Sequence, residues 1–150
     1  MSQIRELLLG IRALQMQTKR LMTLAAKDES LSQGLIFLLF RLSQAGALKI
    51  TDISEELGCT AGAATGMTDR LEEKGLVQRV RSAEDRRIVQ VVLTEEGKAR
   101  LEQIRHNFEK LAFQALYEIP EERLQDMIET VQEITKTMQK HAGGEENDKS

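Results

Sequence analysis

The chain has 150 residues, of which 41% are hydrophobic and 30% are charged, the composition of one soluble globular domain. One tyrosine, four phenylalanines and no tryptophan favour a mainly helical core over a β-sandwich, and a single cysteine excludes a disulfide framework. The formal net charge of −3 argues against a protein that coats nucleic acid by bulk charge. Because the chain lacks a run of about 18 apolar residues and carries charges throughout its first residues, we expect no membrane span, no signal peptide and a cytoplasmic location.

The positive charge is concentrated in one part of the chain. From Glu118 onward, nine residues are acidic and four are basic, whereas the ten residues from Gln78 to Arg87 contain four arginines. A local cluster of this kind indicates a binding partner more clearly than the net charge does.

Apolar residues spaced three and four apart predict two helices at the start of the chain. The first is long and amphipathic and runs to about Ala26. The second is capped by Ser30 or Ser32 and ends near Ala45 and Gly46. Because the second helix is apolar on most faces, we expect it to be buried.

A pair of short helices is predicted next. After an extended segment at residues 48–50, Thr51 caps a helix over residues 52–57, which Gly58 ends. Thr60 caps the following helix over residues 61–74. Apolar side chains from both helices are expected to pack together: Ile53, Leu57, Cys59, Ala64, Met67 and Leu71.

A hairpin and two long helices complete the predicted elements. The β-prone runs 76–81 and 88–93 are separated by a polar loop that is too long for a two-residue turn. Thr94 caps a helix that ends at about Tyr117, and Pro120 takes the first position of the last helix. Residues 143–150 contain no large apolar side chain and predict a disordered tail.

Two short helices followed by a β-hairpin indicate a winged helix-turn-helix, so the predicted fold is mainly α-helical with a small β-hairpin wing. The second short helix leaves a face of little bulk, which allows backbone and hydroxyl groups to approach base edges in a major groove. Arginines at the hairpin tip are placed to reach an adjacent minor groove. The residues predicted to contact DNA are Thr60, Gly62, Ala63, Thr65, Gly66, Arg70, Arg79, Arg86 and Arg87.

Two segments resemble the MarR family of bacterial transcription regulators. The segment TDISEELGCTAGAATGMTDRLEEKGLVQR is similar to the family's recognition unit, and SAEDRRIVQVVLTEEGKA is similar to its wing. The Asp-x-Arg signature of the wing falls on Asp85 and Arg87, followed by Leu93, Thr94 and Gly97. The order of the remaining helices also fits the family.

The resemblance implies a single domain over residues 1–142. Within it, residues 48–93 would form the winged helix-turn-helix lobe that binds DNA, and residues 1–30 and 94–142 would supply the helices that form a homodimer. By the same resemblance, Asp85 would hold Arg87 through a charge-assisted hydrogen bond while an arginine enters the minor groove.

The resemblance also implies how such a protein works. Family members bind pseudo-palindromic operators as homodimers, more often as repressors, and many release DNA when a small aromatic or phenolic effector binds between the dimerisation and DNA-binding regions. Where many members carry an arginine in the recognition helix this chain has Gly66, so one contact to a base or phosphate is missing and the operator sequence cannot be carried over.

Several residues have a second interpretation. The strand arginines, Arg79 among them, could pair with nearby carboxylates, and Cys59 is read as a packing residue rather than a redox sensor. Met16 and Met22 fill the core or, alternatively, line an adaptable ligand pocket. Glu102, His106 and Glu109 share a helix face, but the neighbouring sequence adds no further histidine or cysteine, so we predict no metal site.

Two other classes of function fit the sequence less well. The sequence shows no phosphate-binding glycine loop and no arrangement of nucleophile and base, so we predict neither an enzyme nor a cofactor. The alternative function is a winged-helix module that binds another protein and not DNA. Such modules usually have an acidic or apolar recognition face, and the basic wing therefore favours DNA.

Overall fold

The computed structural model describes residues 1–142, and the predicted disordered tail at residues 143–150 lies outside the described residues. The chain divides into two compact units, one from Met1 to Ala112 and one that begins at Phe113. Among the described residues, none of the helices is long and apolar enough to cross a membrane.

The first two helices confirm the predicted boundaries. Helix α1 spans Ser2–Ala26 and buries only Ala25 and Ala26, so most of its apolar side chains remain exposed within this unit. Helix α2 spans Gln33–Ala45, and the Ser32 side chain caps it by accepting a hydrogen bond from the Leu35 amide. Five residues of α2 are buried and form the centre of the core: Leu35, Ile36, Leu38, Leu39 and Leu42.

The start of the helix-turn-helix differs from the prediction. Strand β1 is Ala47–Leu48, and helix α3 spans Ile50–Leu57, so the helix begins two residues earlier than expected. Thr51 lies inside the helix and is not its cap. Instead, the Asp52 carboxylate accepts a hydrogen bond of 2.9 Å from the Lys49 amide and closes the first turn. Acidic residues in a first turn satisfy unpaired amides in this way.

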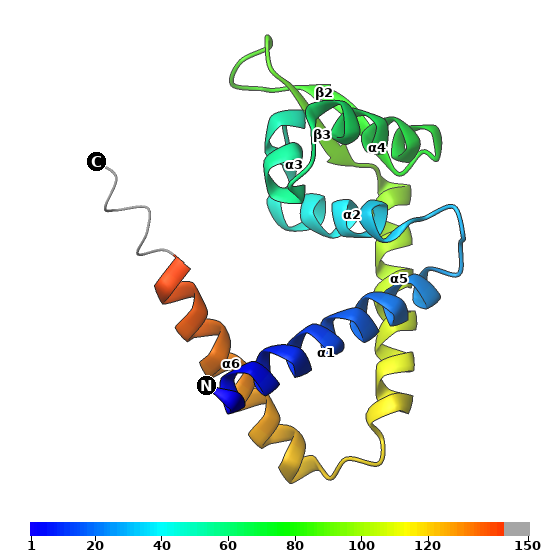
Figure 1. Cartoon of the computed structure of the whole chain (residues 1–150). Coiled ribbons are helices and arrows are strands. Elements are labelled where there is room, and N and C mark those ends of the chain that lie inside the picture. The colour runs from blue at the N-terminus through cyan, green and yellow to red at the C-terminus, as the bar shows by residue number, and fades with distance from the viewer. Residues whose placement is uncertain (143–150) are drawn as a thin grey trace. The chain divides into compact units, whose positions relative to one another are not determined.

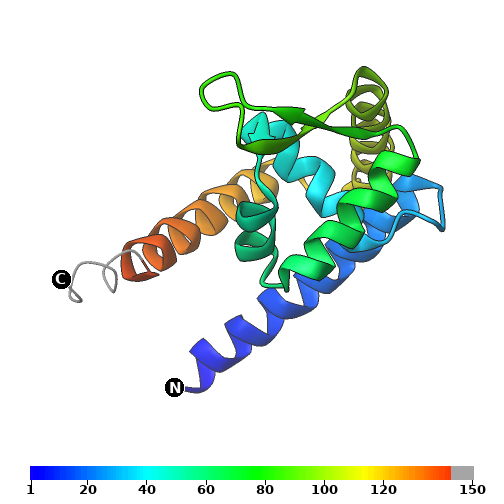
Figure 2. The same ribbon diagram turned by 90° about the horizontal axis from the view of Figure 1, so that it is seen from above.

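The remaining elements of the lobe match the prediction closely. Helix α4 spans Ala61–Glu73 and lies beside α3, to which a short turn joins it (Figure 2). Strands β2 (Val77–Arg81) and β3 (Val89–Leu93) form an antiparallel hairpin, and β3 also pairs with β1, which gives the sheet order β1-β3-β2. We call residues 77–93 the wing. Figure 1 shows its loop extending beyond the ends of the strands.

A tight joint connects the end of the hairpin to the turn after α4. The Thr94 hydroxyl donates to the Gly75 carbonyl over 2.6 Å and accepts from the Gly97 amide over 2.9 Å, so Thr94 caps the next helix as predicted. A Cβ atom on Gly97 would lie 1.9 Å from the Leu76 carbonyl oxygen. Only glycine fits there, because any side chain would collide with backbone.

Helix α5 spans Glu95–Leu116, and its first part anchors α1 within the first unit. Arg100 Nη2 donates to the Ala26 carbonyl over 2.6 Å, and Asn107 Nδ2 donates to the Ala25 carbonyl over 2.9 Å. These two side chains satisfy carbonyls that the end of a helix leaves without partners.

The second unit contains the last residues of α5 and helix α6, which spans Glu121–Ala142. Pro120 stands just before this helix and not at its first position, and its carbonyl accepts from the Leu124 amide over 3.0 Å. Four large apolar residues of α6 are exposed within the unit: Met127, Ile128, Val131 and Met138.

Candidate nucleic-acid interface

Helix α4 presents the low-bulk face that the sequence predicts. The Thr60 side chain accepts a hydrogen bond of 3.2 Å from the Ala63 amide and caps the helix. Gly62, Ala63 and Thr65 are exposed, and Gly66 is half-buried. The core side of the helix buries Ala64, Thr68 and Leu71, which fixes the direction in which the exposed face points. The first two exposed turns therefore offer backbone and one small hydroxyl to a partner, with Arg70 exposed one turn further on.

The wing loop, residues 82–88, presents two arginines at its tip. Arg86 and Arg87 are exposed, and neither takes part in an ion pair of the described chain. The loop has a defined shape because the Ser82 amide donates to the Ile88 carbonyl and the Ile88 amide donates to the Asp85 carbonyl, each over 2.9 Å. Arg81 Nη1 adds a hydrogen bond of 2.8 Å to the Arg86 carbonyl. The loop thus holds two exposed guanidinium groups on an ordered backbone.

Asp85 orients the wing in a different manner from the one implied by the resemblance. Its Oδ1 accepts from the backbone amide of Arg87 over 2.9 Å, and not from the Arg87 guanidinium. A short acidic side chain that binds the amide two residues ahead closes a local turn. Asp85 therefore shapes the loop backbone, which leaves the Arg87 side chain available to a partner.

Arg79 belongs to strand β2 of the wing, and its side chain pairs with two carboxylates of α4. Its Nη2 contacts Asp69 Oδ1 at 2.5 Å, its Nη1 is bonded to Glu72 Oε2, and its amide donates to Glu72 Oε1 over 3.2 Å. Hydrogen bonding to Asp69 raises the pKa of the Arg79 guanidinium above its ordinary value. The alternative interpretation of this strand arginine, pairing with nearby carboxylates, is the arrangement observed, whereas a contact with DNA stays a prediction for Arg79 as for the other residues of the interface.

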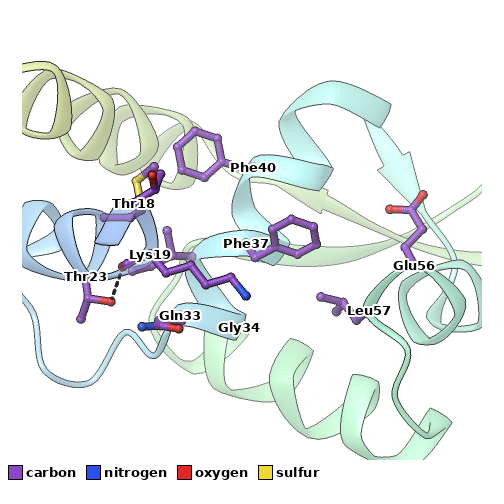
Figure 3. Close-up of a pocket in the computed structure, with 11 residues that line it drawn as sticks. Thr18, Lys19, Thr23, Gln33, Gly34, Phe37, Phe40, Glu56 and Leu57 are labelled. Carbon is purple, nitrogen blue, oxygen red and sulfur yellow. Dashed lines mark hydrogen bonds between the residues drawn. The ribbon is translucent and has the colours of Figure 1, made fainter. Parts of the chain in front are cut away.

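A second feature of this unit is a cavity of about 680 Å³ between α1, α2 and α3. Phe37 and Phe40 of α2 point toward it, and Lys19 of α1 and Glu56 of α3 lie on opposite sides of Phe37 (Figure 3). Met22 lines the cavity, as one interpretation of the sequence proposed, whereas Met16 is exposed and does not. The lining is completed by Thr18, Thr23, Gln33, Gly34, Ile36 and Leu57.

Apart from Met22, the residues that line this cavity were not predicted from the sequence. Phe37 is 48% exposed although five other apolar residues of the same helix are buried. Phe40 carries Arg105 of α5 above its ring, 5.3 Å from the ring centre. The sequence signal that could have indicated the cavity is an aromatic residue on the exposed side of a helix whose other apolar residues are buried. Local periodicity does not show that residues of α3 complete the lining.

The other candidate residues have simple surroundings. Cys59 is half-buried and packs against the core, together with Leu57 and Met67. Ile53, Ala64 and Leu71 are buried, so the predicted small core between α3 and α4 is confirmed. Within residues 1–142, no group of three His, Cys, Asp or Glu residues is placed to hold a metal ion.

A helix-turn-helix followed by a β-hairpin with an extended loop defines the class of winged-helix proteins, and in this chain long helices precede and follow these elements. Solved structures share this fold over most of the chain. A MarR family protein from Bacillus stearothermophilus superposes with a TM-score of 0.77 at 21% identity, covering 92% of this chain and 94% of that one. Wild-type MarR from E. coli, in its apo form, gives 0.72 at 22% identity, covering 83% and 93%.

Comparison of sequences then specifies the family. Residues 31–89 match the model of the MarR family, so the resemblance of this winged-helix segment to that family is confirmed. That family consists of transcription regulators and not of enzymes.

Two relatives from Bacillus subtilis (strain 168) illustrate the extent of the similarity. The HTH-type transcriptional repressor MdtR is 31% identical over 96 residues, which are 64% of this chain and 62% of the repressor. The HTH-type transcriptional regulator YfiV is 45% identical over 71 residues, 47% of this chain and 43% of that protein. The chain thus spans between about two fifths and three fifths of the length of these two relatives.

Proposed function

We propose that this protein is a transcription regulator that binds double-stranded DNA, with α4 in a major groove and the wing loop in the adjacent minor groove. The observation that carries the proposal is the combination of a low-bulk exposed face on α4 with two exposed arginines on an ordered loop of the same lobe, neither of which has an ionic partner within residues 1–142. Small residues permit close approach to base edges, and arginine is favoured in the negative potential of a narrow minor groove. The repressor relative MdtR supports repression as the direction of control.

The wing assignment can be tested by removing one guanidinium. Arg87→Ala should weaken binding to the DNA upstream of the protein's own coding sequence about tenfold, the equivalent of one charge-assisted hydrogen bond. The slope of log affinity against log salt should fall by about one unit, because one fewer counterion is released. Fluorescence anisotropy at several salt concentrations measures both quantities.

The matched control is Arg20→Ala, which removes an exposed arginine of α1 outside the candidate interface. It should leave affinity and slope close to those of the wild type. An Arg87→Ala protein with unchanged affinity and slope would refute the role of the wing. A protein without affinity for any duplex would instead favour the alternative, a winged helix that binds another protein.

We propose further that the protein is a homodimer formed through its terminal helices. The exposed apolar residues of α1 include Ile4, Leu8 and Leu14, and those of α6 include Val131. Apolar stripes of this extent are unusual on the surface of a soluble monomer and mark interaction surfaces. A two-fold dimer would place two copies of α4 on half-sites of a pseudo-palindromic operator.

We also propose that a small aromatic or phenolic effector binds in the cavity between α1, α2 and α3. Phe37, Phe40 and Met22 supply aromatic and thioether surface, while Lys19 supplies a cation at its edge. Mostly apolar pockets with a few polar groups are typical of small-molecule sites. Because the cavity touches both α1 and α3, a ligand there can shift the lobe relative to α1.

Benzoate and phenol, as simple anionic and neutral aromatic probes, test the effector site. Each is titrated into a preformed protein–DNA complex, and release of DNA is followed by anisotropy. At least one probe should release DNA from the wild-type protein, and Phe37→Ala should require a higher concentration for the same release. Release that is identical in the two proteins would place the effector elsewhere.

A further inference from the structure

The exposed face of α4 changes its electrostatic character along its length. Its first two turns contain no charged side chain, whereas its last turns carry Asp69, Glu72 and Glu73 against the single cation Arg70. Asp69 follows Thr65 by four residues and Gly66 by three, so it continues the same helix face. A helix that enters a groove of DNA with this face would bring carboxylates toward phosphates, which repel them.

Arg79 is the group that counters these carboxylates. Its guanidinium pairs with Asp69 and Glu72 at the same time, and its side chain is 29% exposed, compared with 51% for Asp69 and 39% for Glu72. The Arg79 side chain is therefore less exposed to solvent than either carboxylate with which it pairs. With two ionic partners, its guanidinium has fewer N–H groups left for a phosphate than Arg86 or Arg87, which have no ionic partner among the described residues.

We infer that Arg79 is a positioning residue for DNA binding that acts by neutralising Asp69 and Glu72 on the DNA-facing side of α4, and not by contacting DNA. This inference rests on the proposed function. Arg79 is then not one of the residues that contact DNA directly. Strand β2 has an electrostatic role in addition to its pairing in the sheet. Pairing with carboxylates also explains how a helix with net negative charge can approach a polyanion.

A comparison of Arg79→Ala in two backgrounds tests the inference. In the wild-type background, the change exposes two unpaired carboxylates, and affinity for DNA should fall about tenfold, since like charges brought together at an interface are strongly unfavourable. In an Asp69→Asn, Glu72→Gln background, the carboxylates are already neutral. There, Arg79→Ala should change affinity by less than about twofold.

The two backgrounds separate neutralisation from contact. If Arg79 touched a phosphate, its removal would cost the same in both backgrounds and would lower the salt slope by about one unit in each. That result would overturn the inference. The protein with Asp69→Asn and Glu72→Gln but with Arg79 intact should bind DNA at least as tightly as the wild type. Weaker binding by this protein would show that the ion pairs themselves are required and would also contradict neutralisation.

The thermal unfolding of the wild type and of each variant shows whether a change in affinity comes from a loss of stability. Affinities are compared at a temperature at which each protein is folded, and Arg79→Lys, which retains the charge, should recover most of the lost affinity. Failure of the proposed function is distinguishable, because in that case the wild-type protein itself would show no specific binding and Arg87→Ala would have no effect.

Discussion

At the scale of single residues, Asp28 links three parts of the first unit. Its Oδ1 accepts from the Ser30 amide over 2.9 Å and from the Ser30 hydroxyl over 2.5 Å, and its Oδ2 lies 3.8 Å from Arg100 Nη2. The Lys74 ammonium at the end of α4 is bonded in turn to the Ser30 hydroxyl. The loop after α1, the end of α4 and the start of α5 are thus joined through Asp28 and Ser30.

These contacts make stability depend on pH. The hydrogen bonds from Ser30, followed by the charges of Lys74 and Arg100, lower the pKa of Asp28 below its ordinary value of 3.8. A lowered pKa in the folded state means that the contribution is complete above pH 3.8 and is lost as the pH falls through the folded pKa. We expect Asp28→Asn to be less stable than the wild type at pH 7 and to differ from it less at pH 2.

Urea unfolding at the two pH values measures this difference. Glu29→Gln is the matched control, because Glu29 is an exposed neighbour for which no hydrogen bond or ion pair occurs in the described chain. A difference between Asp28→Asn and wild type that stays constant from pH 7 to pH 2 would contradict the linkage.

Features that depend on neighbouring residues in the chain were predicted well from the sequence, and contacts between distant residues were not. Ser32, Thr60 and Thr94 were correctly identified as caps, since a cap depends on residues within one turn. Thr51 was wrong because Asp52 supplies the cap of α3 from inside the helix. The identity of the carboxylates that bind Arg79 depends on how α4 packs beside β2, which sequence spacing does not specify.

At the scale of elements, the two glycines of α4, Gly62 and Gly66, lie where the fold has room for a larger side chain. A Cβ atom on Gly66 would meet nothing within 4 Å, and one on Gly62 would meet only the Thr60 hydroxyl at 4.0 Å. The fold itself therefore does not require glycine at either position. Glycine within a helix costs stability relative to alanine, and the close approach of DNA to α4 is the compensation that the proposed function predicts.

Gly66→Ala should consequently change stability and DNA affinity in opposite directions. We expect unfolding to require about 1 kcal/mol more free energy, because alanine is the better helix former. DNA affinity should fall, because the added methyl group separates α4 from the base edges. Chemical denaturation and anisotropy measure the two effects.

Gly10→Ala on α1 provides a control, since a Cβ atom there also meets nothing within 4 Å. It should stabilise the protein without weakening DNA binding. If Gly66→Ala stabilises the fold and leaves affinity unchanged, then α4 does not approach DNA through this face.

The existence and order of the elements were predictable because apolar periodicity is strong in this chain. The hairpin and the helices appear where expected, within about two residues. The cavity was not predictable, because it forms where α1, α2 and α3 meet and its lining is spread over residues 18–57. Residues that line such a space share no periodic pattern.

At the scale of the whole molecule, assembly is the main expectation. Each of the terminal helices α1 and α6 carries an exposed apolar stripe within its own unit. A partner that buries these stripes would add hydrophobic stabilisation to each unit. A second copy of the chain fits the proposed two-fold recognition of DNA.

Val131→Glu should therefore weaken the dimer, because it places a charge in the apolar stripe of α6. Lys136→Glu introduces the same side chain on the opposite side of the helix and should leave the dimer intact. Sedimentation equilibrium gives the mass of both. A Val131→Glu protein with the same dimer affinity as the wild type would exclude α6 from the interface.

The measurement that tests the account most directly is a hydroxyl-radical footprint on the tightest duplex selected from a random pool. We predict two protected half-sites about 10 bp apart, each flanked by minor-groove protection that disappears in the Arg86→Ala, Arg87→Ala protein. Diffuse protection without half-sites, or flanking protection that persists when both arginines are removed, would contradict the assignment of α4 and the wing as the DNA-binding surface.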